Sequence, residues 1–217
     1  VRFDSLPPGQ KRVDLWLPQF NRVVAHALRV SREAKIEPYK DRRLKWITYG
    51  SSITMCQRAH SPARTWSAIA ARRHNLNLLN MGFAGQCHFD PLVARTIRDQ
   101  PADLISLKLG INTYGGETFT SRTWGPVVLG FLLTIRDGHP NTPMLIVSPI
   151  FCEAREHTPN RAGLTLTEMR ETLESLVDRL RDRGDANIHY LHGIESASSC
   201  PGRASRVSGT ACKSKDD

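Results

Sequence analysis

Apolar strand patterns and helical patterns alternate along residues 44–195, and this alternation predicts a doubly wound α/β domain with a parallel sheet. Short apolar stretches, typical of strands covered on both faces, mark the candidate strands. Longer stretches with helical periodicity separate them. The strands are expected at 44–49, 77–81, 103–109, 143–148 and 188–191, and the helices near 64–74, 90–100, 124–137 and 165–183.

The last of these helices carries the clearest local signals. Thr165 and Glu168 have the spacing of a capping box, which satisfies backbone N–H groups at a helix start. An apolar stripe at helical spacing follows, and Gly184 stands where a C-terminal cap is expected. This helix therefore packs one face onto the sheet.

The two ends of the chain differ from the body. In residues 1–43, the stretches 12–17 and 23–30 have the composition of strands, and 31–43 resembles a charged linker. Two strands alone are marginal in water, so this β-rich segment is either an edge ornament or the remnant of a β domain. Residues 196–217 are rich in small and polar residues without periodicity, so a disordered or aberrant tail is expected.

Composition excludes several functional classes. The net charge of +9 lies mostly in the ends, because residues 44–195 carry 16 basic and 14 acidic side chains. That balance and the low aromatic content, 7%, argue against a nucleic-acid partner. No apolar run is long enough to span a membrane, and no signal peptide is visible, so we expect a cytoplasmic protein. The chain starts at Val1, and secretion stays an alternative if an upstream segment is missing.

Turns built of small and polar residues follow the first three strands. Ser51 and Ser52 follow the first strand, Gly85 the second and Asn112 the third. In the strand order 2-1-3-4-5 these turns are neighbours at the carboxyl edge of the sheet, where ligands bind. A serine hydroxyl, a glycine N–H and an asparagine amide at one edge can form a nucleophile with an oxyanion hole. Taken singly, each is more often a plain turn.

These turns resemble the conserved blocks of the SGNH hydrolases, also called GDSL esterases and lipases. Residues 50–54 are similar to the first block, 80–85 to the second and 110–112 to the third. The resemblance implies a three-layer α/β/α fold with a flavodoxin-like sheet, Ser52 as nucleophile, and the Gly85 amide and Asn112 as oxyanion donors. Ser51 and Thr113 stand where the family usually has aspartate. Residues 1–43 resemble, less specifically, the β-sandwich piece that precedes the domain in some members.

The family's fourth block, Asp-x-x-His, has no counterpart in this sequence. A serine needs that base, yet the last histidine is His192, and the only aspartates after Asp185 are at the C-terminus. We identify no catalytic His or Asp, and our hypothesis is that the tail after Glu195 is frameshifted or aberrant. Three other histidines are expected to be solvated loop residues, as are the carboxylates after the fourth strand: His60, His88 and His157, with Glu153 and Glu156. His189 and His192 bracket the end of the fifth strand, where His192 could approach the site edge, but we do not assign it as the base.

The sequence is therefore compatible with two functions. The first is a serine esterase that cleaves small-molecule or carbohydrate esters, impaired by loss of the histidine. The alternative is a non-catalytic protein that keeps the pocket and binds carbohydrate or a partner. Neither needs a cofactor, and the five cysteines show no zinc-ligand spacing, so no metal is expected. A flavin or nucleotide binder would need a glycine-rich phosphate loop after the first strand, which the sequence lacks.

Overall fold

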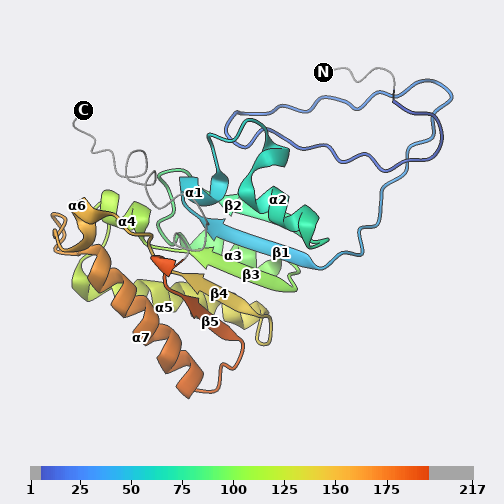
Figure 1. The fold of residues 1–217 in the computed structure, drawn as a ribbon. Coiled ribbons are helices and arrows are strands. Elements are labelled where there is room, and N and C mark those ends of the chain that lie inside the picture. The colour runs from blue at the N-terminus through green and yellow to red at the C-terminus, as the bar shows by residue number, and fades with distance from the viewer. Residues whose placement is uncertain (1–5, 196–217) are drawn as a thin grey trace.

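The computed structural model describes residues 6–195, and its centre is a five-stranded parallel sheet (Figure 1). The strand order is β2-β1-β3-β4-β5, and every neighbouring pair is parallel. This is the predicted 2-1-3-4-5 order, and each strand lies within two residues of its predicted ends. The strands are β1 (Lys45–Gly50), β2 (Asn77–Gly82), β3 (Leu104–Lys108), β4 (Met144–Val147) and β5 (Ile188–Leu191).

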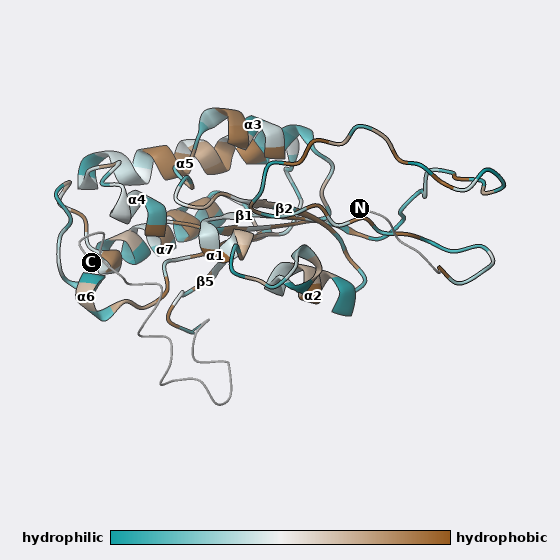
Figure 2. Cartoon of the chain, turned by 90° about the horizontal axis from the view of Figure 1, so that it is seen from above, coloured by the Kyte–Doolittle hydropathy of each residue, from teal (hydrophilic) through white to brown (hydrophobic). Residues whose placement is uncertain are grey.

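Helices cover both faces of this sheet, which confirms the predicted three-layer α/β/α fold. Figure 2 shows α3 and α5 on one side of the sheet and α1 and α2 on the other. Four helices match the predicted ones: α2 (Trp66–Arg73), α3 (Pro91–Asp99), α5 (Ser121–Gly138) and α7 (Leu166–Asp182). Single-turn helices were not predicted, because so few residues show no periodicity: α1 (Ser52–Met55), η1 (Pro62–Arg64), α4 (Ile111–Gly115) and α6 (Glu153–Glu156). Among the helices of residues 6–195, none is long and apolar enough to cross a bilayer.

An aromatic cluster lies in the main core, at the carboxyl half of β1. Tyr49 stacks on Phe131 of α5 with 5.1 Å between the ring centres. Phe89 packs edge-on against both Phe131 and Trp124, at 5.3 Å in each case. All four side chains are buried, so this cluster fixes β1 and α5 directly beneath the edge that carries the three turns.

The ends of α7 have the predicted caps. Thr165 accepts a hydrogen bond from the Glu168 N–H, and the Glu168 carboxylate accepts one from the Thr165 N–H. Gly184 follows the helix with φ +99°, a backbone conformation that glycine adopts without the penalty other residues incur. The capping-box and glycine signals in the sequence are therefore confirmed.

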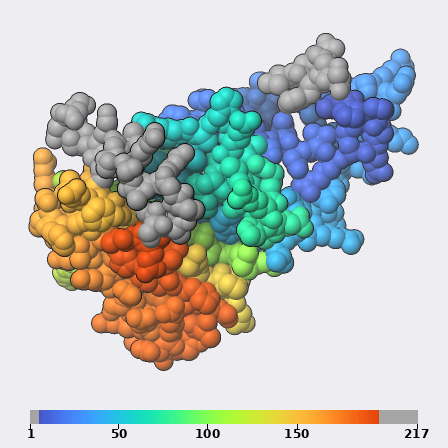
Figure 3. All heavy atoms as spheres, viewed as in Figure 1, coloured from blue at the N-terminus to red at the C-terminus, as the bar shows by residue number. Residues whose placement is uncertain are grey.

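The predicted β-rich character of the N-terminal segment is wrong. Residues 6–43 contain no strand; they form extended arms that protrude from the domain (Figures 1 and 3). The single backbone hydrogen bond within this segment joins the Ala34 N–H to the Ser31 carbonyl. Strands 12–17 and 23–30 would need a partner to bury their apolar side chains, and two strands by themselves bury too little.

Candidate functional site

The turn after β1 places Ser52 at the first position of α1, half-buried at the carboxyl edge of the sheet. The buried Ser51 precedes it as the N-cap, and its hydroxyl accepts a hydrogen bond from the Ile53 N–H at 3.3 Å. Aspartate and serine both cap helices well, which explains how serine stands at the usual aspartate position. Gly50 is required by space, because a Cβ there would lie 2.2 Å from the Thr54 hydroxyl.

The 83–89 loop after β2 is anchored at both ends. The Phe83 N–H donates to the Gly50 carbonyl at 2.7 Å, and the Phe89 N–H donates to the Tyr49 hydroxyl at 3.2 Å. Between these anchors Gly85 is exposed and has φ +70°, with no atom within 4 Å of where a Cβ would be. Glycine is therefore needed for its backbone conformation rather than for close packing. Within residues 6–195, no group accepts a hydrogen bond from the Gly85 N–H.

The turn after β3 places Asn112 in the first turn of α4, beside the 83–89 loop. Its Oδ1 accepts a hydrogen bond from the Cys87 N–H at 3.2 Å. This contact fixes the orientation of the amide, because the oxygen rather than the nitrogen faces the loop. The Asn112 Nδ2 group is then left with no acceptor among the described residues. Thr113 points inward and donates to the Gly110 carbonyl at 2.6 Å.

The three turns are thus tied into one edge, as the strand order predicts. The structure brings Gly85 and Asn112 together through Cys87, and brings the loop to β1 through Phe83 and Gly50. Sequence inspection alone does not find the Cys87–Asn112 contact, which joins residues 25 positions apart. Two polar donors without acceptors therefore lie on the turns next to the one that carries Ser52.

The described histidines near this edge form hydrogen bonds with groups other than Ser52, or none. His88 is held by Gly85 and Thr118, so the expectation of a solvated loop histidine is wrong for it. His60 and His157 are exposed, and His192 accepts a hydrogen bond from the Ile194 N–H at 3.4 Å. No histidine within residues 6–195 forms a hydrogen bond with the Ser52 hydroxyl. The predicted aberrant tail, 196–217, lies outside the described residues.

A buried ion pair stiffens the loop after β4. Glu156 and Arg170 are both buried and form two hydrogen bonds, at 2.6 and 2.7 Å. Arg170 also donates to the Pro149 carbonyl, and Glu156 accepts from the Cys152 N–H. Burial alone would raise the pKa of Glu156, but the hydrogen bonds from Arg170 and Cys152 outweigh it, so the pKa is lowered. The expectation of a solvated carboxylate is therefore wrong for Glu156, while Glu153 is exposed.

Two further ionisable groups lie near the edge. Burial raises the pKa of the Cys87 thiol to about 12, so Cys87 carries almost no thiolate at neutral pH and does not compete with Ser52 as a nucleophile. Burial also lowers the pKa of Lys108, at the end of β3, to about 8. No group of three or more His, Cys, Asp or Glu side chains in residues 6–195 could hold a metal ion.

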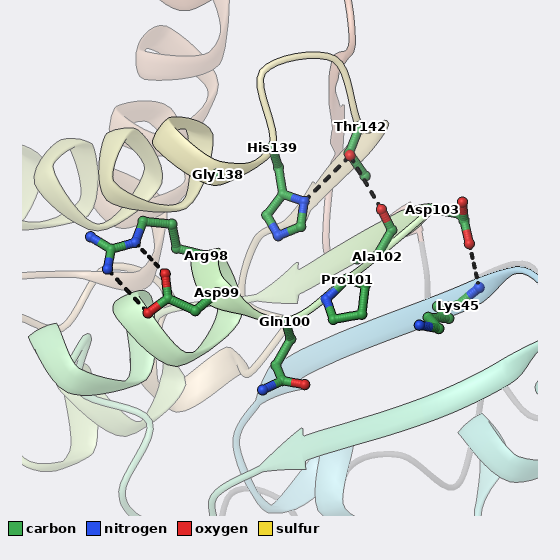
Figure 4. Close-up of a pocket in the computed structure, with 10 residues that line it drawn as sticks. All are labelled: Lys45, Arg98, Asp99, Gln100, Pro101, Ala102, Asp103, Gly138, His139 and Thr142. Carbon is green, nitrogen blue, oxygen red and sulfur yellow. Dashed lines mark hydrogen bonds and ion pairs between the residues drawn. The ribbon is translucent and has the colours of Figure 1, made fainter.

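A separate depression of about 560 Å³ lies at the opposite, amino edge of the sheet (Figure 4). Several of its charged and polar side chains are engaged with one another or with the backbone. Arg98 pairs with Asp99, Asp103 accepts from the Lys45 N–H, and the buried His139 contacts the Ile97 carbonyl. Because no predicted site residue lines it, this depression is not part of the candidate site.

Comparison with known proteins agrees with the fold and the blocks. A model of the GDSL-like lipase/acylhydrolase family matches residues 44–199. A solved structure described as the salicylyl-acyltransferase SsfX3 from a tetracycline biosynthetic pathway is 37% identical, with a TM-score of 0.66, and the match covers 73% of this chain and 45% of that one. A GDSL-like lipase from Bacteroides ovatus is 22% identical, with a TM-score of 0.61, over 77% and 48% of the two chains. A search of curated proteins found no match.

This chain therefore belongs to the GDSL-like lipase/acylhydrolase family, the SGNH hydrolases, which is a family of ester hydrolases. The chain spans about half the length of these two structures. The 22% identical neighbour supports the fold alone.

Proposed function

We propose that this chain is a serine acyl hydrolase in which Ser52 attacks the carbonyl carbon of an ester. In the proposed reaction the Ser52 oxygen forms a bond to that carbon, and its proton passes to a base. The tetrahedral oxyanion collapses and expels the alcohol, leaving an acyl-enzyme that water hydrolyses. No cofactor or metal takes part.

The orientation of Asn112 is the observation that carries this proposal. Its Oδ1 is engaged by the Cys87 N–H, and within residues 6–195 neither its Nδ2 group nor the Gly85 N–H has an acceptor, so both can donate. Free donors held in place before the reaction stabilise an oxyanion without a reorganisation cost, and one such donor is typically worth about 10²–10³ in rate.

The proposed substrate is a small-molecule or carbohydrate O-acyl ester. The structure similar at 37% identity is described as an acyltransferase, and neighbours of the same fold include a family two carbohydrate esterase from Clostridium thermocellum, at 14% identity. Both of these proteins are described as acting on acyl groups or their esters. We further propose that turnover is slow, because no described histidine contacts Ser52 to take its proton.

Hydrolysis of p-nitrophenyl acetate by the parent chain and by Ser52→Ala, with and without added imidazole, tests the proposal. Imidazole is a small base that can take the place of a missing histidine side chain. We expect a rate component that requires both Ser52 and imidazole, after subtraction of imidazole's own reaction. Equal rates for the parent and Ser52→Ala at every imidazole concentration would contradict the proposal.

Asn112→Asp is the matched test of the oxyanion donor. An aspartate keeps the acceptor for the Cys87 N–H but replaces the free Nδ2 donor with a negative oxygen. The Ser52-dependent rate should fall about 10²–10³-fold while the fold is kept, as circular dichroism would show.

The alternative, a non-catalytic carbohydrate- or partner-binding protein, predicts a different result. It expects carbohydrate binding by calorimetry and no Ser52-dependent hydrolysis, even after an Asp-x-x-His sequence is restored at the C-terminus.

A further inference from the structure

We propose that His88 is a positioning residue that holds the Gly85 peptide in the conformation in which its N–H can donate to the oxyanion. This inference rests on the proposed function, because it concerns the donor that Gly85 supplies. His88 lies three residues after Gly85, within the same 83–89 loop.

Both ring nitrogens of His88 have partners. Nε2 lies 3.0 Å from the Gly85 carbonyl oxygen, and Nδ1 lies 2.8 Å from the Thr118 hydroxyl. A carbonyl oxygen only accepts, so Nε2 carries the proton and donates it to Gly85. In the neutral ring Nδ1 then accepts from the Thr118 hydroxyl. The ring is thus a bridge with one donor and one acceptor, and has no free nitrogen with which to serve Ser52 as a base.

This bridge adds a side-chain restraint at Gly85, whose turn is otherwise held by backbone hydrogen bonds. The loop is anchored at Phe83, Cys87 and Phe89, and the Gln86 N–H donates to the Phe83 carbonyl at 3.2 Å. Gly85 itself has no side chain, is exposed and adopts φ +70°. A glycine rotates more freely than any other residue. The Gly85 carbonyl belongs to the peptide that follows Gly85, whereas the Gly85 N–H belongs to the peptide before it. The ring and the Gln86 N–H together hold the following peptide, and this limits the rotation by which Gly85 could turn its own N–H away.

The same bridge joins the loop to the element that carries the second donor. Thr118 lies just after α4, whose first turn holds Asn112. The ring also packs closely against Gly116, where a Cβ would lie 2.9 Å from the His88 Cε1 atom. Two cross-links, His88 to Thr118 and Cys87 to Asn112, therefore hold both oxyanion donors as one rigid unit. Such pre-organisation matters because a displacement of about 1 Å can cost about 10²-fold in rate.

The first experiment compares three variants in the imidazole-supported hydrolysis of p-nitrophenyl acetate, each corrected with its own Ser52→Ala background. His88→Ala should lower the Ser52-dependent kcat about 10–100-fold and leave KM within about twofold, because the oxyanion forms only after binding. His88→Gln keeps an amide donor and an acceptor, and should recover most of the loss. Thr118→Val removes one end of the bridge and should cause a smaller loss, about 3–5-fold.

A kcat for His88→Ala equal to that of the parent would overturn the inference, as would a loss that appears in KM alone. So would failure of His88→Gln to recover any rate while its thermal unfolding matches that of the parent. If the parent itself shows no Ser52-dependent rate, the proposed function fails, and the second experiment then decides the positioning role.

The second experiment needs no turnover. In ¹⁵N-labelled protein, His88 should show the Nε2–H tautomer, and the Gly85 amide should give one sharp resonance. That resonance should broaden or exchange faster with solvent in His88→Ala, but not in His88→Gln. An Nδ1–H tautomer, or a Gly85 amide unchanged in His88→Ala, would overturn the inference.

Discussion

The N-terminal segment, residues 6–43, and strand β1 are both rich in apolar side chains, but only β1 became part of a sheet. Ile47 and Tyr49 of β1 are almost completely buried, while Val13 and Leu15 of the segment are 67% and 62% exposed. β1 has a hydrogen-bonded neighbour on each side, whereas the segment pairs with no strand within the described residues. An apolar or alternating pattern therefore predicts a strand only where a partner strand and a covering layer are available.

Ion pairs in the domain and in the N-terminal segment should also differ, and breaking the buried pair should cause the largest loss of unfolding free energy. Arg170→Met should lower the free energy of unfolding by about 3–5 kcal/mol, because it leaves the Glu156 carboxylate buried without its partner. Arg43→Met is the matched control in the N-terminal segment, where the partly exposed pair with Asp41 should be worth no more than about 1 kcal/mol. Urea denaturation at pH 7 measures both, and equal losses would remove the distinction between the two regions.

The difference in unfolding free energy between the parent and Arg170→Met should depend on pH in a defined direction. The folded-state pKa of Glu156 is lowered, so its stabilising contribution is present above the unfolded-state pKa, near 4.5, and is lost as the pH falls through the folded value. In Arg170→Met, burial instead favours the protonated carboxyl. As the pH falls, the gap between parent and variant should therefore begin to narrow above pH 4.5, where the variant's buried carboxyl takes up a proton, and should narrow further below pH 4.5, where the parent loses stability. A constant gap would contradict this account.

Truncating an apolar side chain should destabilise the protein much more in the sheet than in the N-terminal segment. Leu107 of β3 is fully buried, so Leu107→Ala should cost about 2–5 kcal/mol of unfolding free energy. Leu15 is exposed, so Leu15→Ala should change the free energy of unfolding by less than about 0.5 kcal/mol. Thermal or urea unfolding measures the pair. A large loss for Leu15→Ala would mean that the segment is packed in solution.

Lys108 offers a change that stabilises the domain. Its pKa, about 8 in the folded chain and about 10.5 in a model peptide, means that folding disfavours the charged amine. Lys108→Met should therefore raise the free energy of unfolding by about 1–3 kcal/mol at pH 7. The extra stability of Lys108→Met over the parent should be complete below pH 8. It should disappear between pH 8 and 10.5, because there the folded parent loses its buried charge and gains stability. Urea denaturation at pH 7 and pH 10 tests this, and an advantage that grew with pH would contradict it.

The smallest effect on the domain should come from cutting the N-terminal segment. Basic residues in its exposed arms, such as Arg22 and Arg29, should be the first trypsin sites within residues 6–195. The unfolding temperature of the remaining body should change little, because the segment contributes few buried contacts. Mass spectrometry of the fragments and a thermal scan check this. First cuts inside 44–195 would mean that the segment is the better protected region.

The sheet was predictable because its signals are local and repeated. Five apolar stretches, four amphipathic helices and the Thr165–Glu168 cap each depend on residues close in sequence, and the carboxyl-edge rule then places the three turns together. The short helices α1, α4 and α6 were missed, because one helical turn shows no period. The buried pair of Glu156 and Arg170 was missed too, because its residues lie 14 positions apart on different elements.

The sequence by itself determined the fold class, because short-range patterns mark the strands and helices. The resemblance of three blocks to a known family supplied the family and the strand order, and the general rule of parallel sheets then located Ser52, Gly85 and Asn112 on neighbouring turns. Only the tertiary structure decided that the amide nitrogen of Asn112 has no acceptor among residues 6–195, that His88 bridges Gly85 and Thr118, and that residues 6–43 form no strand. The physical reason is the same in each case. Which donor finds which acceptor, and whether an apolar stretch is buried, depends on groups brought together from distant parts of the chain.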